Sequence, residues 1–112
     1  MKKAYVPEAG DLVSLTFDPQ PGREQTGRPA LVLSPAIYNG RAGLALACPI
    51  TTQIKGYPFE VLLPAGCRAT GVVLADHIKT VEWKARLAER IDRCPLETFE
   101  DVRARLAPLI GC

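Results

Sequence analysis

The sequence contains few of the residues from which common catalytic and metal sites are built. It has one histidine, one tryptophan and four cysteines in 112 residues. A single histidine excludes a two-histidine ribonuclease, and the cysteines (Cys48, Cys67, Cys94 and Cys112) form no C-x-x-C pair of the kind found in zinc sites. The G-x-S-x-G, H-E-x-x-H and phosphate-binding-loop patterns are also absent. We therefore expect no metal ion, no cofactor and four free thiols.

Long apolar runs and a strong excess of one charge are absent as well. No segment approaches the ~18 apolar residues of a membrane span, and no apolar stretch of signal-peptide length follows the first lysines. We therefore expect a cytoplasmic protein that does not contact a membrane. Fourteen Lys and Arg against twelve Asp and Glu leave a net charge of only +2, so a site for an anionic partner has to be local.

The composition is that of an ordinary small globular protein. A chain of 112 residues suffices for one hydrophobic core, so we expect residues 1–112 to form a single domain. Short apolar or alternating runs bounded by turn residues predict strands at 12–17, 30–34, 44–49, 59–63, 72–75 and 78–81. Asn39-Gly40 predicts a turn between the second and third of these. Strands with this spacing predict a small antiparallel barrel or sandwich.

The C-terminal third changes character. Residues 84–94 are charged and fit either a strand or a helix, and a strand is favoured. Beyond them, Pro95 suits a first helical residue, acidic side chains follow, and Gly111 suits the end of the segment. Apolar residues recur there at helical spacing, namely Leu96, Phe99, Val102, Leu106, Leu109 and Ile110. We expect this helix to cover one face of the sheet.

The connector at 18–29 is the first candidate for a functional segment. It holds three prolines, two glycines and four charged residues, which is too polar for a core. Irregular loops of about a dozen residues are uncommon in compact domains and are often functional. Glu24 and Arg28 could act here as a base and as a stabiliser of charge on a phosphorane. The alternative is an ordinary surface ion pair that contributes little.

The segment at 50–59, ITTQIKGYPF, is the second candidate. Its Thr51 and Thr52 hydroxyls and the Lys55 cation could hold a phosphate, while the Gln53 amide and the Tyr57 ring could read and stack an unpaired base. This mixture of groups suits single-stranded RNA. The alternative is a plain loop between strands, with its aromatic rings packed in the core.

Around these residues the sequence resembles the MazF/PemK toxin family, the ribosome-independent mRNA interferases of type II toxin-antitoxin pairs. The resemblance extends over 5–86 and is closest to the MazF branch. It is carried by five segments in order: YVPEAGDLV, FDP, GREQTGRPALVLSPAIYNG, CPITTQIKGYPFEV and GVVLADHIKTVEWKAR. It implies a mainly β protein with a C-terminal helix, built as a small CcdB/SH3-like antiparallel barrel, which forms a homodimer.

The resemblance also implies an activity and the residues that perform it. The activity is a metal-independent cleavage of single-stranded RNA by the substrate's own 2′-hydroxyl, leaving a 2′,3′-cyclic phosphate and a 5′-hydroxyl. By position, the implied catalytic residues are Glu24, Arg28 and Thr51. The general base is either Glu24 or Asp76. Residues expected to contact RNA are Arg23, Gln25, Thr52, Gln53, Lys55, Tyr57 and Asp76.

A protein partner is implied as well. It is a cognate antitoxin with an acidic, extended tail, for which Arg23, Arg28 and Lys55 would be the anchors. Two other functions fit the same fold: a non-catalytic CcdB-like toxin that acts by binding a protein, and an SH3-like binding module. The Glu24, Arg28 and Thr51 set favours the ribonuclease, because a pure binder has no evident use for it.

Overall fold

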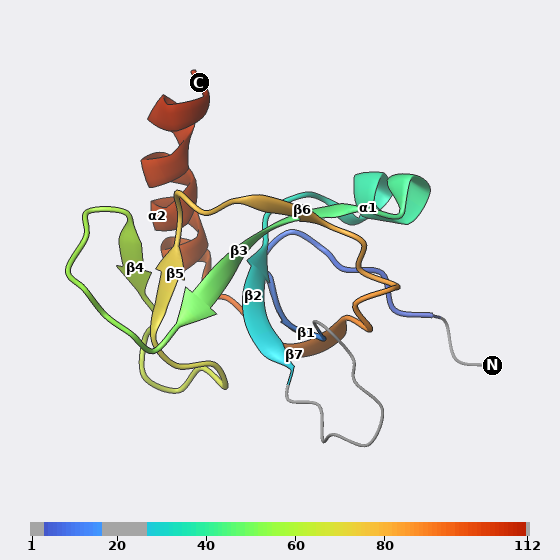
Figure 1. Ribbon diagram of the computed structural model, residues 1–112, viewed down its shortest axis with the longest axis horizontal. Coiled ribbons are helices and arrows are strands. Elements are labelled where there is room, and N and C mark those ends of the chain that lie inside the picture. The colour runs from blue at the N-terminus through green and yellow to red at the C-terminus, as the bar shows by residue number, and fades with distance from the viewer. Residues whose placement is uncertain (1–3, 17–26, 112) are drawn as a thin grey trace.

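An antiparallel sheet and a C-terminal helix dominate the described part of the chain, which is residues 4–16 and 27–111 of the computed structural model (Figure 1). The strands there are β1 Asp11–Leu15, β2 Arg28–Val32, β3 Ala45–Thr51, β4 Glu60–Leu62, β5 Val72–Leu74, β6 Lys79–Val81 and β7 Glu89–Arg93. The helices are α1 Ala36–Ala42, α2 Leu96–Leu106 and a 3-10 turn at Ala107–Ile110. The predicted class, mainly β with a C-terminal helix, is confirmed.

All strand pairings are antiparallel, and the strand order is β4-β5-β3-β2-β1-β7, with β6 paired to β3. Among the described strands, β4 and β7 remain at opposite ends of this path. The predicted barrel is therefore a strongly curved sheet that hydrogen bonds do not close. The long β3 contributes most to this shape, because it pairs with β2 along its middle and with β5 and β6 at its two ends.

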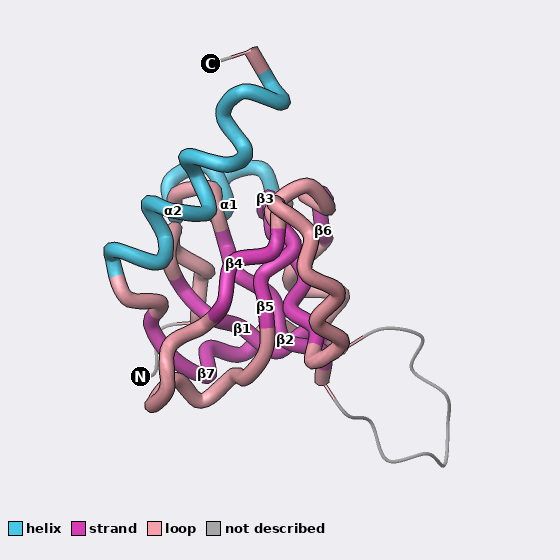
Figure 2. Tube along the Cα trace, turned by 90° about the vertical axis from the view of Figure 1, so that its left-hand side faces the viewer, coloured by secondary structure: helices cyan, strands magenta, loops and turns pink. Residues whose placement is uncertain are grey.

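Alternation along β1 and β2 produces two apolar clusters, one on each face of the sheet. Leu12 and Leu31 face the first cluster, where Val102 of α2 and Val73 of β5 are fully buried. Side chains on the other face pack around Trp83. Figure 2 shows α2 running alongside β4, so the helix covers one face as predicted. No helix in the described ranges has the length and apolar character of a membrane span.

The predicted turn at Asn39-Gly40 is wrong, because these residues lie inside α1. Asn39 is fully buried, and its side-chain amide donates to the carbonyls of Pro7 and Ser34 at 2.8 and 2.9 Å. Its Oδ1 accepts a 2.6 Å bond from the Ser34 hydroxyl. These tertiary partners satisfy the polar side chain inside a helix, where sequence statistics favour a turn. Gly43, with φ of 71°, then ends the helix in a left-handed cap.

The prediction for the C-terminal third is confirmed for the helix and for part of the strand. Residues 83–87 form turns, and β7 occupies only the second half of the stretch at 84–94 for which a strand was favoured. Pro95 is the N-cap of α2, and Gly111 caps the following 3-10 turn with φ of 79°. Of the predicted apolar stripe, Val102 and Leu106 are buried, whereas Leu96, Leu109 and Ile110 are exposed.

Candidate active site

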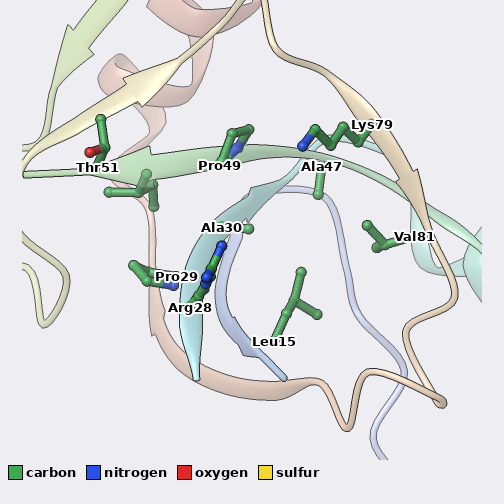
Figure 3. A pocket seen from close by; sticks show the side chains of 10 residues that line it. Leu15, Arg28, Pro29, Ala30, Ala47, Pro49, Thr51, Lys79 and Val81 are labelled. Atoms are coloured by element: carbon green, nitrogen blue, oxygen red, sulfur yellow. The ribbon is translucent and has the colours of Figure 1, made fainter. Parts of the chain in front are cut away.

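Arg28 and Thr51 line the same cavity, although 22 residues of sequence separate them. Arg28 begins β2 and Thr51 ends β3, and the two strands pair through Ala30↔Pro49. Because the pair is antiparallel, the start of one strand lies beside the end of the other. Arg28 and Thr51 each lie two residues beyond this last pair, at the same end of the two strands. Figure 3 shows both side chains at the cavity, whose volume is about 420 Å³.

The charge that the described residues bring to this cavity is positive. Its charged lining residues among those described are Arg28 and Lys79, and most of the remaining wall is apolar, contributed by side chains such as Leu15, Ala47 and Val81. Lys79 reaches the cavity because β6 pairs with β3 through Ala47↔Lys79. Two cations among apolar side chains favour the binding of an anionic group of the size of a phosphate.

The Thr51 hydroxyl is oriented by its own loop. Its Oγ1 accepts a 3.1 Å hydrogen bond from the backbone N–H of Gln53. An oxygen that accepts in this way still has its own proton to donate to another group. The backbone of Thr51 is also held closely, since Gly71 passes beside it with φ of 114°, and a Cβ at Gly71 would overlap the Thr51 carbonyl. Position 71 therefore requires glycine for both its space and its conformation.

Thr51 also lines a second, smaller cavity of about 130 Å³. This cavity lies between the segment after β3 and the turn after β5, and most of its lining residues have polar or charged side chains. It offers a cation, carboxylates, an imidazole and an amide, from Gln53, Lys55, Tyr57, Glu60, Leu74, Asp76 and His77. Thr51 thus stands between a cationic cavity and one rich in hydrogen-bond donors and acceptors. This arrangement could hold a phosphate on one side and a base on the other.

The structure groups the predicted binding residues only in part. Gln53, Lys55, Tyr57 and Asp76 line the second cavity, while Thr52 is exposed outside both cavities. Tyr57 is 60% exposed, so the alternative in which its ring packs in the core is wrong. Phe59 does pack against the core. Arg23, Glu24 and Gln25 lie outside the described residues, and their predicted roles remain predictions.

Sequence reasoning missed three residues of these cavities. Lys79 and Glu60 lie inside the strands predicted at 78–81 and 59–63, and His77 is the single histidine of the sequence. The signal for Lys79 and His77 is the pairing of β6 and β5 with β3, which a single sequence does not reveal. His77 Nε2 lies 3.7 Å from an Asp76 carboxylate oxygen, and both side chains are exposed.

The described cysteines line neither of the two cavities. Cys48, Cys67 and Cys94 are free thiols. Burial, with a smaller contribution from the Asp76 charge, raises the pKa of Cys48 to about 12, so that this thiol stays protonated at neutral pH. In residues 4–16 and 27–111, no three His, Cys, Asp or Glu side chains gather as a metal site would require. Cys112 lies outside these ranges.

Comparison with known proteins places the chain among toxins. Residues 8–110 match the family described as PemK-like, MazF-like toxin of type II toxin-antitoxin system. The chain is 47% identical over 112 residues to the endoribonuclease toxin MazF of Escherichia coli strain K12, covering 99% of this chain and 100% of that protein. It is 34% identical over 108 residues to endoribonuclease PemK of Escherichia coli, covering 92% and 81% respectively. A crystal structure of MazE-MazF from Deinococcus radiodurans matches with a TM-score of 0.88 and 53% identity, over 96% of this chain and 98% of that chain.

Proposed function

This chain belongs to the PemK-like, MazF-like toxin family of type II toxin-antitoxin systems, and we propose that it is an endoribonuclease that cuts single-stranded RNA at specific sequences without the ribosome. Its relatives MazF and PemK are named endoribonucleases. The observation that carries the proposal is the shared cavity of Arg28 and Thr51. A guanidinium and a hydroxyl that line one cationic cavity can both contact a single phosphodiester.

The proposed reaction uses a nucleophile from the substrate. A base removes the proton of a 2′-hydroxyl, the new bond forms between the 2′-oxygen and phosphorus, and the bond from phosphorus to the 5′-oxygen breaks. The departing oxygen takes up a proton, which leaves a 2′,3′-cyclic phosphate and a 5′-hydroxyl. The base is Glu24 or Asp76, of which Asp76 lines the second cavity next to Thr51. Neither a metal ion nor a cofactor takes part in these steps.

Arg28 and Thr51 then have different roles. Arginine stays protonated at physiological pH, so the contribution of Arg28 is chiefly electrostatic, through stabilisation of charge on the phosphorane. Thr51 donates its hydroxyl proton to a non-bridging phosphate oxygen and so positions the phosphate. The acceptor bond from Gln53 N–H orients the hydroxyl for this purpose. Lys79 adds positive charge to the same cavity.

Recognition of single strands follows from the second cavity. Bases in an A-form duplex are hard for side chains to reach, whereas an unpaired base can enter a small polar pocket. Gln53 and Asp76 supply the donors and acceptors that read a base edge, and the exposed Tyr57 ring supplies a stacking surface. Arg23, Gln25, Thr52 and Lys55 add contacts with the RNA backbone or bases.

The family also suggests partners and a location. Solved relatives include MazE-MazF complexes, and we expect this chain to bind a cognate antitoxin whose acidic, extended tail lies over Arg28 and Lys55, and over Arg23. Such a tail would occupy the phosphate-binding cavity and block cleavage. We further expect a homodimer of single-domain subunits in the cytoplasm, where the RNA substrate is found.

One experiment tests the proposed function directly. The purified protein is incubated with a defined single-stranded RNA, and the chemistry of the product ends is mapped. Cyclic phosphate and 5′-hydroxyl ends at a recurring sequence are expected. If the RNA stays intact and the protein instead binds another protein, the CcdB-like toxin or the SH3-like module is supported. Product ends with a 5′-phosphate would contradict attack by the 2′-hydroxyl.

A further inference from the structure

The loop that carries the proposed base-reading side chains makes few contacts with the hydrophobic core. Between β3 and β4, residues 52–58 are all exposed, and Ile54 is 58% exposed despite its apolar side chain. A segment with so few buried contacts is expected to fluctuate unless polar bonds hold it. Gln53, Lys55 and Tyr57 project from this loop into the second cavity.

Glu60 supplies such bonds from the first residue of β4. Its carboxylate accepts hydrogen bonds from three successive backbone N–H groups of the loop. Oε1 lies 2.8 Å from the Gly56 nitrogen, 3.2 Å from that of Lys55 and 3.3 Å from that of Tyr57, and Oε2 lies 3.1 Å from the Lys55 nitrogen. Successive N–H groups that converge on one anion form a nest, which depends on a left-handed residue. Gly56 is that residue, with φ of 84°.

The carboxylate itself is firmly placed. Glu60 pairs with Leu74 of β5, so its backbone belongs to the sheet. Its own N–H donates to the Tyr57 carbonyl at 3.1 Å, which closes the loop from the other direction. On the far side, the Arg105 guanidinium of α2 donates to the Pro58 carbonyl. The loop is thus held between the edge of the sheet and the helix, by the Glu60 carboxylate on one side and the Arg105 guanidinium on the other.

We propose that Glu60 is a positioning residue for RNA recognition, whose carboxylate holds the backbone of Lys55, Gly56 and Tyr57 so that the loop presents its base-reading side chains in one arrangement. The proposal rests on the proposed ribonuclease function. Glu60 acts here through the loop and not by contact with RNA. Its loss therefore weakens binding and sequence discrimination, because the bound RNA must order the loop itself, while the chemistry at Arg28 and Thr51 is retained.

Two variant pairs test the proposal by steady-state cleavage of a single-stranded RNA oligonucleotide and of a one-base variant of it. Glu60→Gln removes the charge, and Glu89→Gln makes the same change on β7, at the opposite end of the strand order. Gly56→Ala disturbs the nest while leaving Glu60 in place, and Gly66→Ala is its control, because both glycines have positive φ and no atom within 4 Å of an added Cβ.

The expected result is a rise in KM of at least about tenfold for Glu60→Gln and Gly56→Ala, within the roughly hundredfold that misplacing a binding group by 1 Å can cost. Discrimination against the one-base variant falls, while kcat stays close to that of the controls. Amide hydrogen exchange at residues 55–57 loses protection in both variants and in neither control.

Three results would contradict the positioning role of Glu60 or distinguish it from the proposed ribonuclease function. If both variants match their controls in KM and discrimination, Glu60 has no positioning role. If only Glu60→Gln is impaired and Gly56→Ala is not, Glu60 contacts RNA directly and the proposal is wrong. If the wild-type protein cleaves no RNA, the proposed function fails, whereas the exchange measurement still reports whether Glu60 holds the loop.

Discussion

Arg28 at the start of β2 and Thr51 at the end of β3 line one cavity, and each lies two residues beyond the last pair of the two strands, Ala30↔Pro49. The antiparallel pairing of the two strands creates this relationship, because neither residue is near the other along the chain. It brings a guanidinium and a hydroxyl to a site whose other charged lining residue in the described part of the chain is Lys79. The connector and the TTQ segment thus each contribute a described residue to one cavity, and their convergence on one phosphodiester remains a prediction.

Arg28→Ala should lower kcat/KM for RNA cleavage by about a hundredfold to a thousandfold, the usual cost of losing one preorganised donor to the transition state. Arg28→Lys should recover only part of the rate, because lysine lacks the forked geometry that binds two phosphate oxygens. Arg41→Ala removes the same charge from the exposed end of α1 and serves as the control. Unchanged cleavage by Arg28→Ala would remove Arg28 from the mechanism.

Thr51→Val should also impair cleavage, whereas Thr51→Ser should stay within about tenfold of the wild-type rate, because it keeps the hydroxyl. The valine variant loses two things: the donor to the phosphate and the acceptor for Gln53 N–H. Single-turnover cleavage with enzyme in excess over RNA separates the two: the rate at saturating enzyme reports the chemical step, and the enzyme concentration that gives half of this rate reports binding. Equal rates for the serine and valine variants would contradict the proposed role of the hydroxyl.

Gly71→Ala should destabilise the protein by about 1–3 kcal/mol, because an added Cβ overlaps the Thr51 carbonyl and the residue has φ of 114°. It should also reduce cleavage in the fraction that folds, because Thr51 has to move. Gly66 has a similar positive φ of 101°, but an added Cβ there would meet open space. Comparing the free energies of unfolding of Gly71→Ala and Gly66→Ala in denaturant therefore separates the cost of backbone strain from the cost of steric overlap. Equal losses in the two variants would mean that the contact with Thr51 is unimportant.

A single 2′-deoxynucleotide immediately 5′ of the cut should abolish cleavage of an otherwise normal RNA, because the nucleophile is then missing. A chelator in excess should leave the rate unchanged. The all-RNA oligonucleotide and a 2′-deoxynucleotide placed several positions away are the controls. Cleavage of the modified linkage, detected on a sequencing gel, would require a different nucleophile.

The hydrogen bonds between the Glu60 carboxylate and its loop should persist in mildly acidic solution. Partial desolvation raises the pKa of Glu60, but the hydrogen bonds from Lys55, Gly56 and Tyr57 N–H and the Lys55 charge outweigh it and lower the pKa from its ordinary value. A carboxylate with a lowered folded pKa stabilises the folded loop fully above its ordinary pKa, and this contribution is lost as pH falls through the lowered value. We therefore expect the loop to stay held as pH falls through the ordinary glutamate range and to loosen only in stronger acid.

The pH dependence can be followed through the amide resonances of Lys55, Gly56 and Tyr57. Asp76 and His77 line the same cavity from the β5 side, so Glu60→Gln is needed to separate their titration from that of Glu60. In that variant the low-pH transition should disappear. A transition at or above the ordinary glutamate pKa in the wild-type protein would show that the backbone bonds do not hold the charged form.

The elements near the site differ in how well sequence predicts them. The strands around Leu12, Leu31 and Val73 are predicted because their apolar residues alternate or cluster as buried strands require. The helix α1 is missed because a buried hydrogen-bond set around Asn39 outweighs the local preference of Asn-Gly for a turn. Barrel closure is overpredicted, since spacing indicates the number of strands but not whether the first and last of them pair.

The residues of the candidate site also differ in how well the sequence predicts them. Arg28 and Thr51 are recognisable from sequence, because they stand in motifs that resemble a known family. Lys79 and Glu60 are not, because a lysine or a glutamate in an alternating strand has no local feature that sets it apart. Their roles depend on which strand lies beside β3 and on where a carboxylate meets three backbone N–H groups.

By itself, the sequence determined the mainly β class, the C-terminal helix, the family and the chemical groups available for cleavage, because these follow from local periodicity and from residues in recognisable order. Only the tertiary structure decided which of those groups meet. It brought Arg28, Thr51 and Lys79 to one cavity and placed the Glu60 carboxylate against the backbone N–H groups of its loop. The physical reason is that strand register and backbone hydrogen bonds join residues that are distant in the chain, and no single segment encodes such a pairing.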